Sequence, residues 1–192
     1  RLISPIGDPL EVIGRILELD LLVTESLHGA ILADTFGVPW IPFASSGNFS
    51  VFKWTDWTLS VELAPRVAPV RPPSAVTALR YGRGRIADGE GPRLDRATAE
   101  EDLAWRNRPD HQAAPSSPKG PKDWVKRGLL AVPALAAAVP GFGPEQTADD
   151  LRRAAGREAQ GSRAALRDSL TDRALSLLRD LQHTAAEDSV RP

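Results

Sequence analysis

A short polar turn in the first third of the chain carries the residue types best suited to chemistry. Glu25, Ser26, His28 and Gly29 follow an apolar run at residues 21–23. A turn between a strand end and a helix start is where α/β proteins commonly bind anions. His28 is one of three histidines, and an imidazole can bind an anion or shuttle a proton near neutral pH. Because Glu25 is suited to accept a hydroxyl proton, the turn predicts an anion-binding and proton-transfer site.

The backbone of this turn also favours a negatively charged ligand. We expect the amides of residues 27–29 to be unpaired at the helix start and directed at a crevice, where the helix dipole adds to the attraction. Gly29 would let a ligand approach the backbone closely. The alternative is an ordinary helix start, with Ser26 as its N-cap and His28 as an exposed residue without function.

A second polar turn precedes the first predicted helix. Ser4 and Gly7 lie in the loop at residues 4–8, after a predicted short strand at residues 2–3. Serine and glycine suit contact with a phosphate or a sugar, and we expect this loop at the same sheet edge as His28. A capped loop without a ligand is the alternative.

A third polar turn follows the next predicted strand. Ser45 and Ser46 lie in the loop at residues 44–48, and open parallel sheets bind ligands at the carboxyl ends of their strands. Lys53, one turn into the following helix, is placed to supply a positive charge. A solvated lysine is the alternative interpretation of this residue.

The elements that must hold these turns alternate between helix and strand. Apolar periodicity and end signals predict, in order, helix 9–20, strand 21–23, helix 27–36, strand 38–43 and helix 48–63. Short strand–helix–strand links imply a parallel crossover, so we expect an α/β fold with a Rossmann-like parallel sheet. Pro39 and Pro42 place the second strand at a sheet edge or give it an early end.

Local signals also predict how two of these helices are built. Asp8 is the expected N-cap of the first helix and Asp20 its end. Leu10, Ile13 and Leu17 are expected on one apolar face, with Val12 and Ile16 beside it. The helix at residues 48–63 is rich in aromatic side chains, whose simplest role is to pack against the sheet.

The composition changes after residue 63. Proline, arginine and alanine dominate residues 64–122 and predict a loosely structured connector with one or two short helices, one of them capped by Thr98. Two more helices are expected to begin at Thr147 and Ser169. The predicted parts are a sheet lobe with ligand-binding turns at 1–63, a connector at 64–146, and C-terminal helices that pack back at 147–192.

Composition excludes several kinds of function. The formal net charge of −1 gives no electrostatic basis for binding nucleic acid. The chain has no cysteine, which excludes a disulfide framework, a thiolate metal site and a cysteine nucleophile. His111 and His183 have no partner at metal-ligand spacing, so we expect no metal. No charged-then-apolar leader is visible, and we expect a cytoplasmic protein.

Two further features concern the context of the chain. The apolar stretch at 128–142 contains two prolines and is shorter than the roughly 20 residues of a spanning helix, so an interfacial or core helix is expected. Peripheral association with the inner membrane surface is compatible with such a helix. The chain contains no methionine, even at position 1, and we expect it to be a fragment of a longer protein.

The first third of the chain also carries a family signature. Residues 4–43 read SPIGDPLEVIGRILELDLLVTESLHGAILADTFGVPWIPF, with an initial Ser-Pro, a Leu-His-Gly-Ala turn and a Gly-Val-Pro stretch after the helix. A Lys53-Trp54-x-x-Trp57 element follows. With these features the chain resembles the C-terminal half of polysaccharide pyruvyl transferases, and most of all the branch that acts in bacterial exopolysaccharide synthesis, of the succinoglycan ketalase type.

The resemblance implies a fold and a reaction. It implies the C-terminal, Rossmann-like lobe of a two-domain enzyme of the GT-B type. Such an enzyme transfers a pyruvyl group from phosphoenolpyruvate to saccharide hydroxyls as a ketal, without a cofactor, and the acceptor is a lipid-linked or nucleotide-linked saccharide. Because the first lobe lies outside this chain, we expect the isolated chain to be incomplete and inactive.

The resemblance also assigns residues. The family's histidine maps to His28 and its neighbouring glycine to Gly29, whereas many members have an arginine where this chain has Ser26. The cationic role would then pass to Lys53 or to a residue outside the chain. Ketal formation needs a proton for the methylene carbon and a base for the attacking hydroxyl, which suggests His28 as anion ligand or acid and Glu25 as base or orienting group.

Two alternatives to this function remain open. The same turn would hold the diphosphate of a nucleotide sugar if the chain were a lobe of a GT-B glycosyltransferase. A truncated remnant with an intact fold and no turnover is the other alternative. The oligomeric state does not follow from the sequence.

Overall fold

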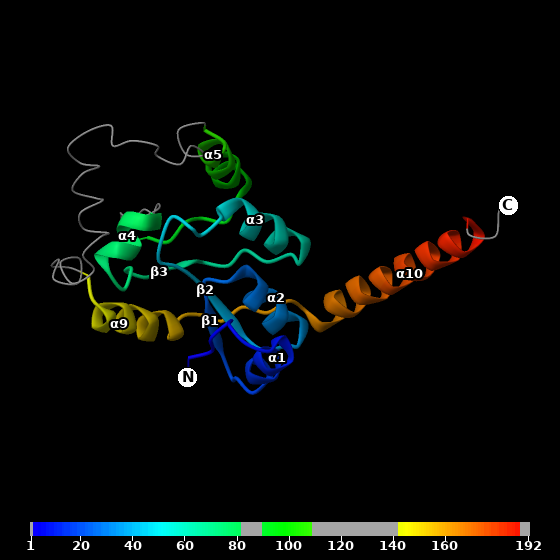
Figure 1. The fold of residues 1–192 in the computed structure, drawn as a ribbon, viewed down its shortest axis with the longest axis horizontal. Coiled ribbons are helices and arrows are strands. Elements are labelled where there is room, and N and C mark those ends of the chain that lie inside the picture. The colour runs from blue at the N-terminus through cyan, green and yellow to red at the C-terminus, as the bar shows by residue number, and fades with distance from the viewer. Residues whose placement is uncertain (1, 82–89, 109–141, 189–192) are drawn as a thin grey trace.

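The computed structural model describes residues 2–81, 90–108 and 142–188 (Figure 1). The predicted elements at 128–142, His111 and most of the second half of the connector lie outside the described residues. The described elements are, in order, α1 Pro9–Leu17, β1 Leu22–Thr24, α2 Leu27–Thr35, β2 Trp40–Ala44, α3 Val51–Ser60, β3 Ala68–Pro69, α4 Ala75–Tyr81, α5 Arg96–Arg106, α9 Pro144–Ala155 and α10 Ala164–Asp188.

The strands form a small parallel sheet in the order β1-β2-β3. β1 pairs with β2 from Leu22↔Trp40 to Thr24↔Pro42, and α2 packs against both strands. The predicted α/β class is therefore confirmed. The sequence placed β2 at an edge or gave it an early end because of its prolines, and the edge position is wrong: β2 is the central strand, and Pro42 is buried in it.

The hydrogen-bond pattern explains how β2 accommodates a central proline. The N–H of Trp40 donates to the carbonyl of Gln160 (3.0 Å), and the N–H of Val70 donates to the carbonyl of Ala44 (3.0 Å). Alternate residues of a strand direct their backbone groups to the same side. Pro42 lies between Trp40 and Ala44, so its missing N–H falls at the step where β2 changes partner from Gln160 to β3.

Strand β3 was not predicted, because its residues lie in a proline-rich stretch. Its Ala68 pairs with Phe43 and its Pro69 with Ala44. With only two residues and no alternation, β3 gives no periodic signal. Its pairing with β2 holds it in the sheet. Ala68 is almost fully buried there, and Val70, which follows β3, is completely buried.

An aromatic cluster joins the sheet to α3. Trp40 of β2 lies 5.9 Å from Trp54 and 5.2 Å from Trp57 between ring centroids, and Phe49 stacks on Trp54 at 5.2 Å. Trp40 and Trp54 are among the largest fully buried side chains. The predicted core role of these aromatic residues is confirmed, although Phe52 on the same helix is 40% exposed.

The first helix buries Ile16, which was predicted beside the apolar face, and leaves two residues of that face exposed. Asp8 caps α1 as expected, accepting hydrogen bonds from the amides of Leu10 and Glu11. However, Leu10 is 77% and Leu17 is 47% exposed, whereas Ile16 is 4% exposed and packs in the core. α1 contacts α2. Packing against that helix, rather than the number of apolar residues on a face, therefore decides which side of α1 is buried. The helix ends at Leu17, before the predicted Asp20.

Three helices after residue 90 begin earlier than predicted. The N-cap of α5 is Asp95, whose carboxylate accepts from the amide of Thr98 (2.8 Å). α9 begins at Pro144 and α10 at Ala164. The cap-like residues Thr98 and Thr147 therefore lie one turn inside their helices, because a better cap or an N-terminal proline precedes each of them.

The C-terminal helices differ in how they meet the sheet. α9 contacts all three strands, whereas α10 projects away from the rest of the molecule (Figure 1). The segment between them is anchored by Asp34 of α2, which is 4% exposed. Its carboxylate accepts from the amide (2.7 Å) and the hydroxyl (2.6 Å) of Ser162 and from Nε1 of Trp40 (3.2 Å). No helix in the described part of the chain is long and apolar enough to span a membrane.

Candidate functional site

The turns after β1 and β2 are joined by a carboxylate. Glu25 follows β1, and its two oxygens accept hydrogen bonds from the amide (2.9 Å) and the hydroxyl (2.7 Å) of Ser45, which follows β2. Ser45 is 9% exposed. Each turn was predicted at the carboxyl end of its strand, and these hydrogen bonds show that the two turns meet there. Because both oxygens of Glu25 are engaged, its carboxylate is held in one orientation.

The first turn is more closed than its sequence suggests. The hydroxyl of Thr24 accepts from the amide of Ser26 (3.0 Å), and the hydroxyl of Ser26 accepts from the amide of Gly29 (3.2 Å). The predicted open amide of Gly29 is thus wrong, because Ser26 acts as the N-cap of α2. A Cβ on Gly29 would lie 3.1 Å from the hydroxyl of Thr24, so close internal packing also favours glycine at this position.

The remaining donors of the turn face outward. His28 is exposed in the first turn of α2. Within the described part of the chain, the amides of Leu27 and His28 have no protein acceptor. The arrangement therefore offers an exposed imidazole and two helix-start amides, which suit one anionic group.

The loop after β2 is held by residues that the sequence did not single out. The guanidinium of Arg106 on α5 donates to the carbonyls of Gly47 (3.1 Å) and Phe49 (2.6 Å). The same guanidinium pairs with Asp102 (2.9 Å). Ser46, which is 6% exposed, accepts from the amide of Asn48 (3.3 Å). Glu25 and Arg106 thus fix the two ends of this loop, and Ser46 is part of its internal structure.

The other predicted site residues lie at the surface. Ser4 is exposed, and its hydroxyl accepts from the amide of Ile6 (3.2 Å). Gly7 is exposed with a φ of 146°, which favours glycine. The strand predicted at residues 2–3 does not form. Lys53 is exposed on α3.

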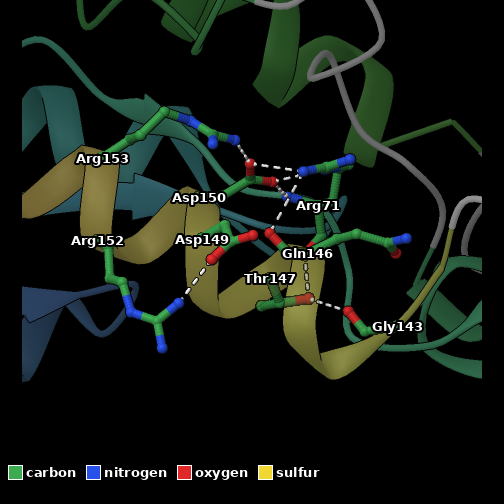
Figure 2. A network of polar contacts seen from close by, with 8 residues as sticks. All are labelled: Arg71, Gly143, Gln146, Thr147, Asp149, Asp150, Arg152 and Arg153. Carbon is green, nitrogen blue, oxygen red and sulfur yellow. Dashed lines mark hydrogen bonds and ion pairs between the residues drawn. The ribbon is translucent and has the colours of Figure 1, made fainter.

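A second polar network lies at the carboxyl end of β3 (Figure 2). The amide and Nε of Arg71 each donate to Oδ2 of Asp150 at 2.8 Å, and Nη2 donates to Oδ1 at 3.0 Å. Arg153 also pairs with Asp150, and the hydroxyl of Thr147 donates to the carbonyl of Arg71 (3.0 Å). α9 is thereby attached to the end of β3. No local signal in the sequence indicates this network, because its partners come from segments 79 positions apart.

This network predicts a pH dependence of stability. The hydrogen bonds from Arg71 hold the pKa of Asp150 below its ordinary value of 3.8. A carboxylate whose pKa is lowered by folding stabilises the protein above its unfolded-state pKa, and this contribution is lost as the pH falls below about 4. Asp150→Asn should therefore lower the urea midpoint at about pH 7 and flatten its fall towards about pH 3. Asp149→Asn, on the same helix, is the control, and an unchanged pH profile in Asp150→Asn would contradict the assignment.

The described residues offer no cage for a metal ion. In this part of the chain, no group of three or more histidine, aspartate or glutamate side chains gathers as metal ligands do. The donors at the carboxyl edge of the sheet are instead backbone amides, hydroxyls and an imidazole, while the carboxylate of Glu25 accepts from Ser45. Such a set suits hydrogen bonding to an organic anion.

The part of the chain that forms this edge of the sheet is similar to known proteins. Residues 1–47 match the family model for polysaccharide pyruvyl transferase. A stretch of 70 residues is 49% identical to the succinoglycan biosynthesis protein ExoV of Rhizobium meliloti (strain 1021), covering 35% of this chain and 22% of that protein. The chain thus spans about a fifth of the length of this relative. No solved structure gives a significant match. The resemblance to the polysaccharide pyruvyl transferase family predicted from the sequence is therefore confirmed, and it lies in the N-terminal part of the chain.

Proposed function

We propose that this chain forms part of a polysaccharide pyruvyl transferase. The enzyme transfers a pyruvyl group from phosphoenolpyruvate to saccharide hydroxyls as a ketal in exopolysaccharide biosynthesis. The family match and the similarity to a succinoglycan biosynthesis protein support the general activity. The observation that carries the proposal for the donor is the exposed His28 at the start of α2, next to the Glu25–Ser45 bridge.

Phosphoenolpyruvate suits the donors at this edge. It carries a phosphate and a carboxylate, and both accept hydrogen bonds from backbone amides and from a protonated imidazole. The amides of Leu27 and His28 and the imidazole of His28 bind one of these groups. Ser26 stands where many family members have an arginine, so binding here depends on His28 and the helix start rather than on a guanidinium.

The reaction assigns a different task to each side chain. One saccharide hydroxyl adds to C2 of phosphoenolpyruvate while a proton goes to the methylene carbon, and a second hydroxyl then displaces the phosphate to close the ketal. His28 supplies the proton or stabilises the phosphate. Glu25, whose oxygens are both bonded to Ser45, orients the loop that faces the acceptor, with Ser46 and Lys53 beside it. Ser4 and Gly7 contact the saccharide.

The wider setting follows from the same proposal. The sheet is part of the Rossmann-like C-terminal lobe of a GT-B enzyme, and the other lobe supplies the opposite side of the cleft. The acceptor is a saccharide linked to a lipid or to a nucleotide, and the reaction takes place in the cytoplasm at the inner surface of the membrane. No cofactor takes part in this chemistry.

A ligand titration tests this function without requiring turnover. Phosphoenolpyruvate should raise the melting temperature of the chain in a concentration-dependent way, and more than pyruvate or inorganic phosphate does at equal concentration. Stabilisation by a nucleotide sugar but not by phosphoenolpyruvate would instead support a glycosyltransferase lobe. If neither ligand binds, the proposal fails and the chain is a folded remnant.

A further inference from the structure

A groove rich in arginine runs along β3. It consists of two neighbouring cavities of about 560 Å³ and 460 Å³. The first is lined by residues 64–67 and 90–95, and the second lies between β3 and α9. Arg157, just beyond the end of α9, lines both cavities and joins them. The size of each cavity is typical of small-molecule sites.

Positive charge exceeds negative charge in this groove. Arg66 and Arg93 line the first cavity together with Arg157. Within the described part of the chain, none of these three arginines forms an ion pair with a carboxylate. The first cavity also contains Glu90 and Asp95. The carboxylate of Asp95 is already used as the N-cap of α5.

The second cavity adds two oriented arginines. Arg71 and Arg153 line it, and both guanidinium groups converge on the carboxylate of Asp150, whose side chain is 10% exposed (Figure 2). An arginine has five N–H donors, so each of the two keeps donors beyond those bonded to Asp150. The carboxylate of Asp150 therefore orients two guanidinium groups at the groove, and both keep N–H donors for a ligand.

The wall of the first cavity is closely packed. A Cβ on Gly91 would lie 1.8 Å from the carbonyl oxygen of Val67, so only glycine permits this approach of the two cavity-lining segments. Arg66 and Arg93 thus extend from two closely packed segments. Guanidinium groups over two connected cavities, two of them held by Asp150, suit the paired phosphates of a diphosphate, because a guanidinium donates bidentate hydrogen bonds to phosphate oxygens.

We propose that this groove binds the diphosphate that links the acceptor saccharide to its carrier, with Arg157 between the two phosphates. The identity of this ligand rests on the proposed function, whereas diphosphate binding itself does not. The donor then binds at His28 and the acceptor's anionic group binds along β3. Arg71 directly follows β3 at the carboxyl edge, so one end of the groove meets the edge where Glu25 and Ser45 lie.

The test is calorimetric titration of the chain with inorganic diphosphate. The wild type should bind it, and Arg157→Ala should weaken binding by about tenfold or more, the size expected for losing one charge-assisted hydrogen-bonded pair. Arg152→Ala is the matched control, because Arg152 lies on α9, pairs with Asp149 and does not line the groove. Absence of binding to the wild type, or equal affinity in Arg157→Ala, overturns the proposal.

Two further arms separate the sources of the ligand and the two proposals. A nucleoside diphosphate sugar and a short, water-soluble isoprenyl diphosphate are titrated in parallel, and tighter binding of one identifies a nucleotide or a lipid carrier. The phosphoenolpyruvate titration is repeated with Arg157→Ala and should be unchanged. Diphosphate binding without phosphoenolpyruvate binding supports the groove and refutes the proposed donor, and the reverse refutes the groove alone.

Discussion

Replacing His28 with alanine should weaken the binding of phosphoenolpyruvate by about tenfold or more, because a charge-assisted hydrogen bond to an anion contributes about 1.5–3 kcal/mol. His28 is exposed at the start of α2, so its removal leaves the core intact and the urea midpoint close to that of the wild type. Affinity is measured by isothermal titration calorimetry.

The control for this prediction uses the same helix. Thr35→Ala changes an exposed residue at the far end of α2 and should leave the affinity for phosphoenolpyruvate unchanged. Equal affinity of His28→Ala and the wild type would remove His28 from the donor site.

The largest effect on stability is expected for Asp34→Ala. The carboxylate of Asp34 is buried and accepts from Nε1 of Trp40 and from the amide and hydroxyl of Ser162. Its removal leaves three buried donors without acceptors, so the free energy of unfolding should fall by about 3 kcal/mol. Urea unfolding followed by tryptophan fluorescence measures this change, because Trp40 belongs to the aromatic cluster.

Two comparisons make the stability result specific. Asp56→Ala removes an exposed carboxylate from α3 and should change the free energy of unfolding by less than about 0.5 kcal/mol. Ser162→Ala removes only the hydroxyl donor and should cost about 1 kcal/mol. A loss of less than about 1 kcal/mol in Asp34→Ala would mean that the segment around Ser162 is not anchored by this carboxylate.

The division of the site between rigid and open parts has a physical basis. Glu25 joins the turn after β1 to Ser45, at the start of the loop after β2. Arg106 of α5 binds the carbonyl of Gly47 towards the other end of that loop. These hydrogen bonds hold the backbone at the carboxyl edge, while His28 stays exposed. A prearranged edge with an open imidazole is suited to binding a charged ligand, because little ordering remains to be done when the ligand arrives.

Local sequence signals determined much of the sheet and its turns. The helix start at Asp8, the N-cap at Ser26 and the left-handed Gly37 at the end of α2 depend on residues within a few positions of one another. The short helical connection between β1 and β2 predicted that the two strands are parallel, and they pair in this way. For this reason the position of His28 in an exposed turn, and the family resemblance of that segment, could be predicted from the sequence.

The tertiary structure alone decided which distant residues meet. Arg106 reaches Gly47 across 59 positions, Asp150 reaches Arg71 across 79, and Ser162 reaches Asp34 across 128. Burial of the central Pro42, the short strand β3 and the arginine groove likewise depend on these meetings. Capping and periodicity act within a few residues, whereas these contacts form only when packing brings separate segments together, so the sequence by itself carries no local sign of them.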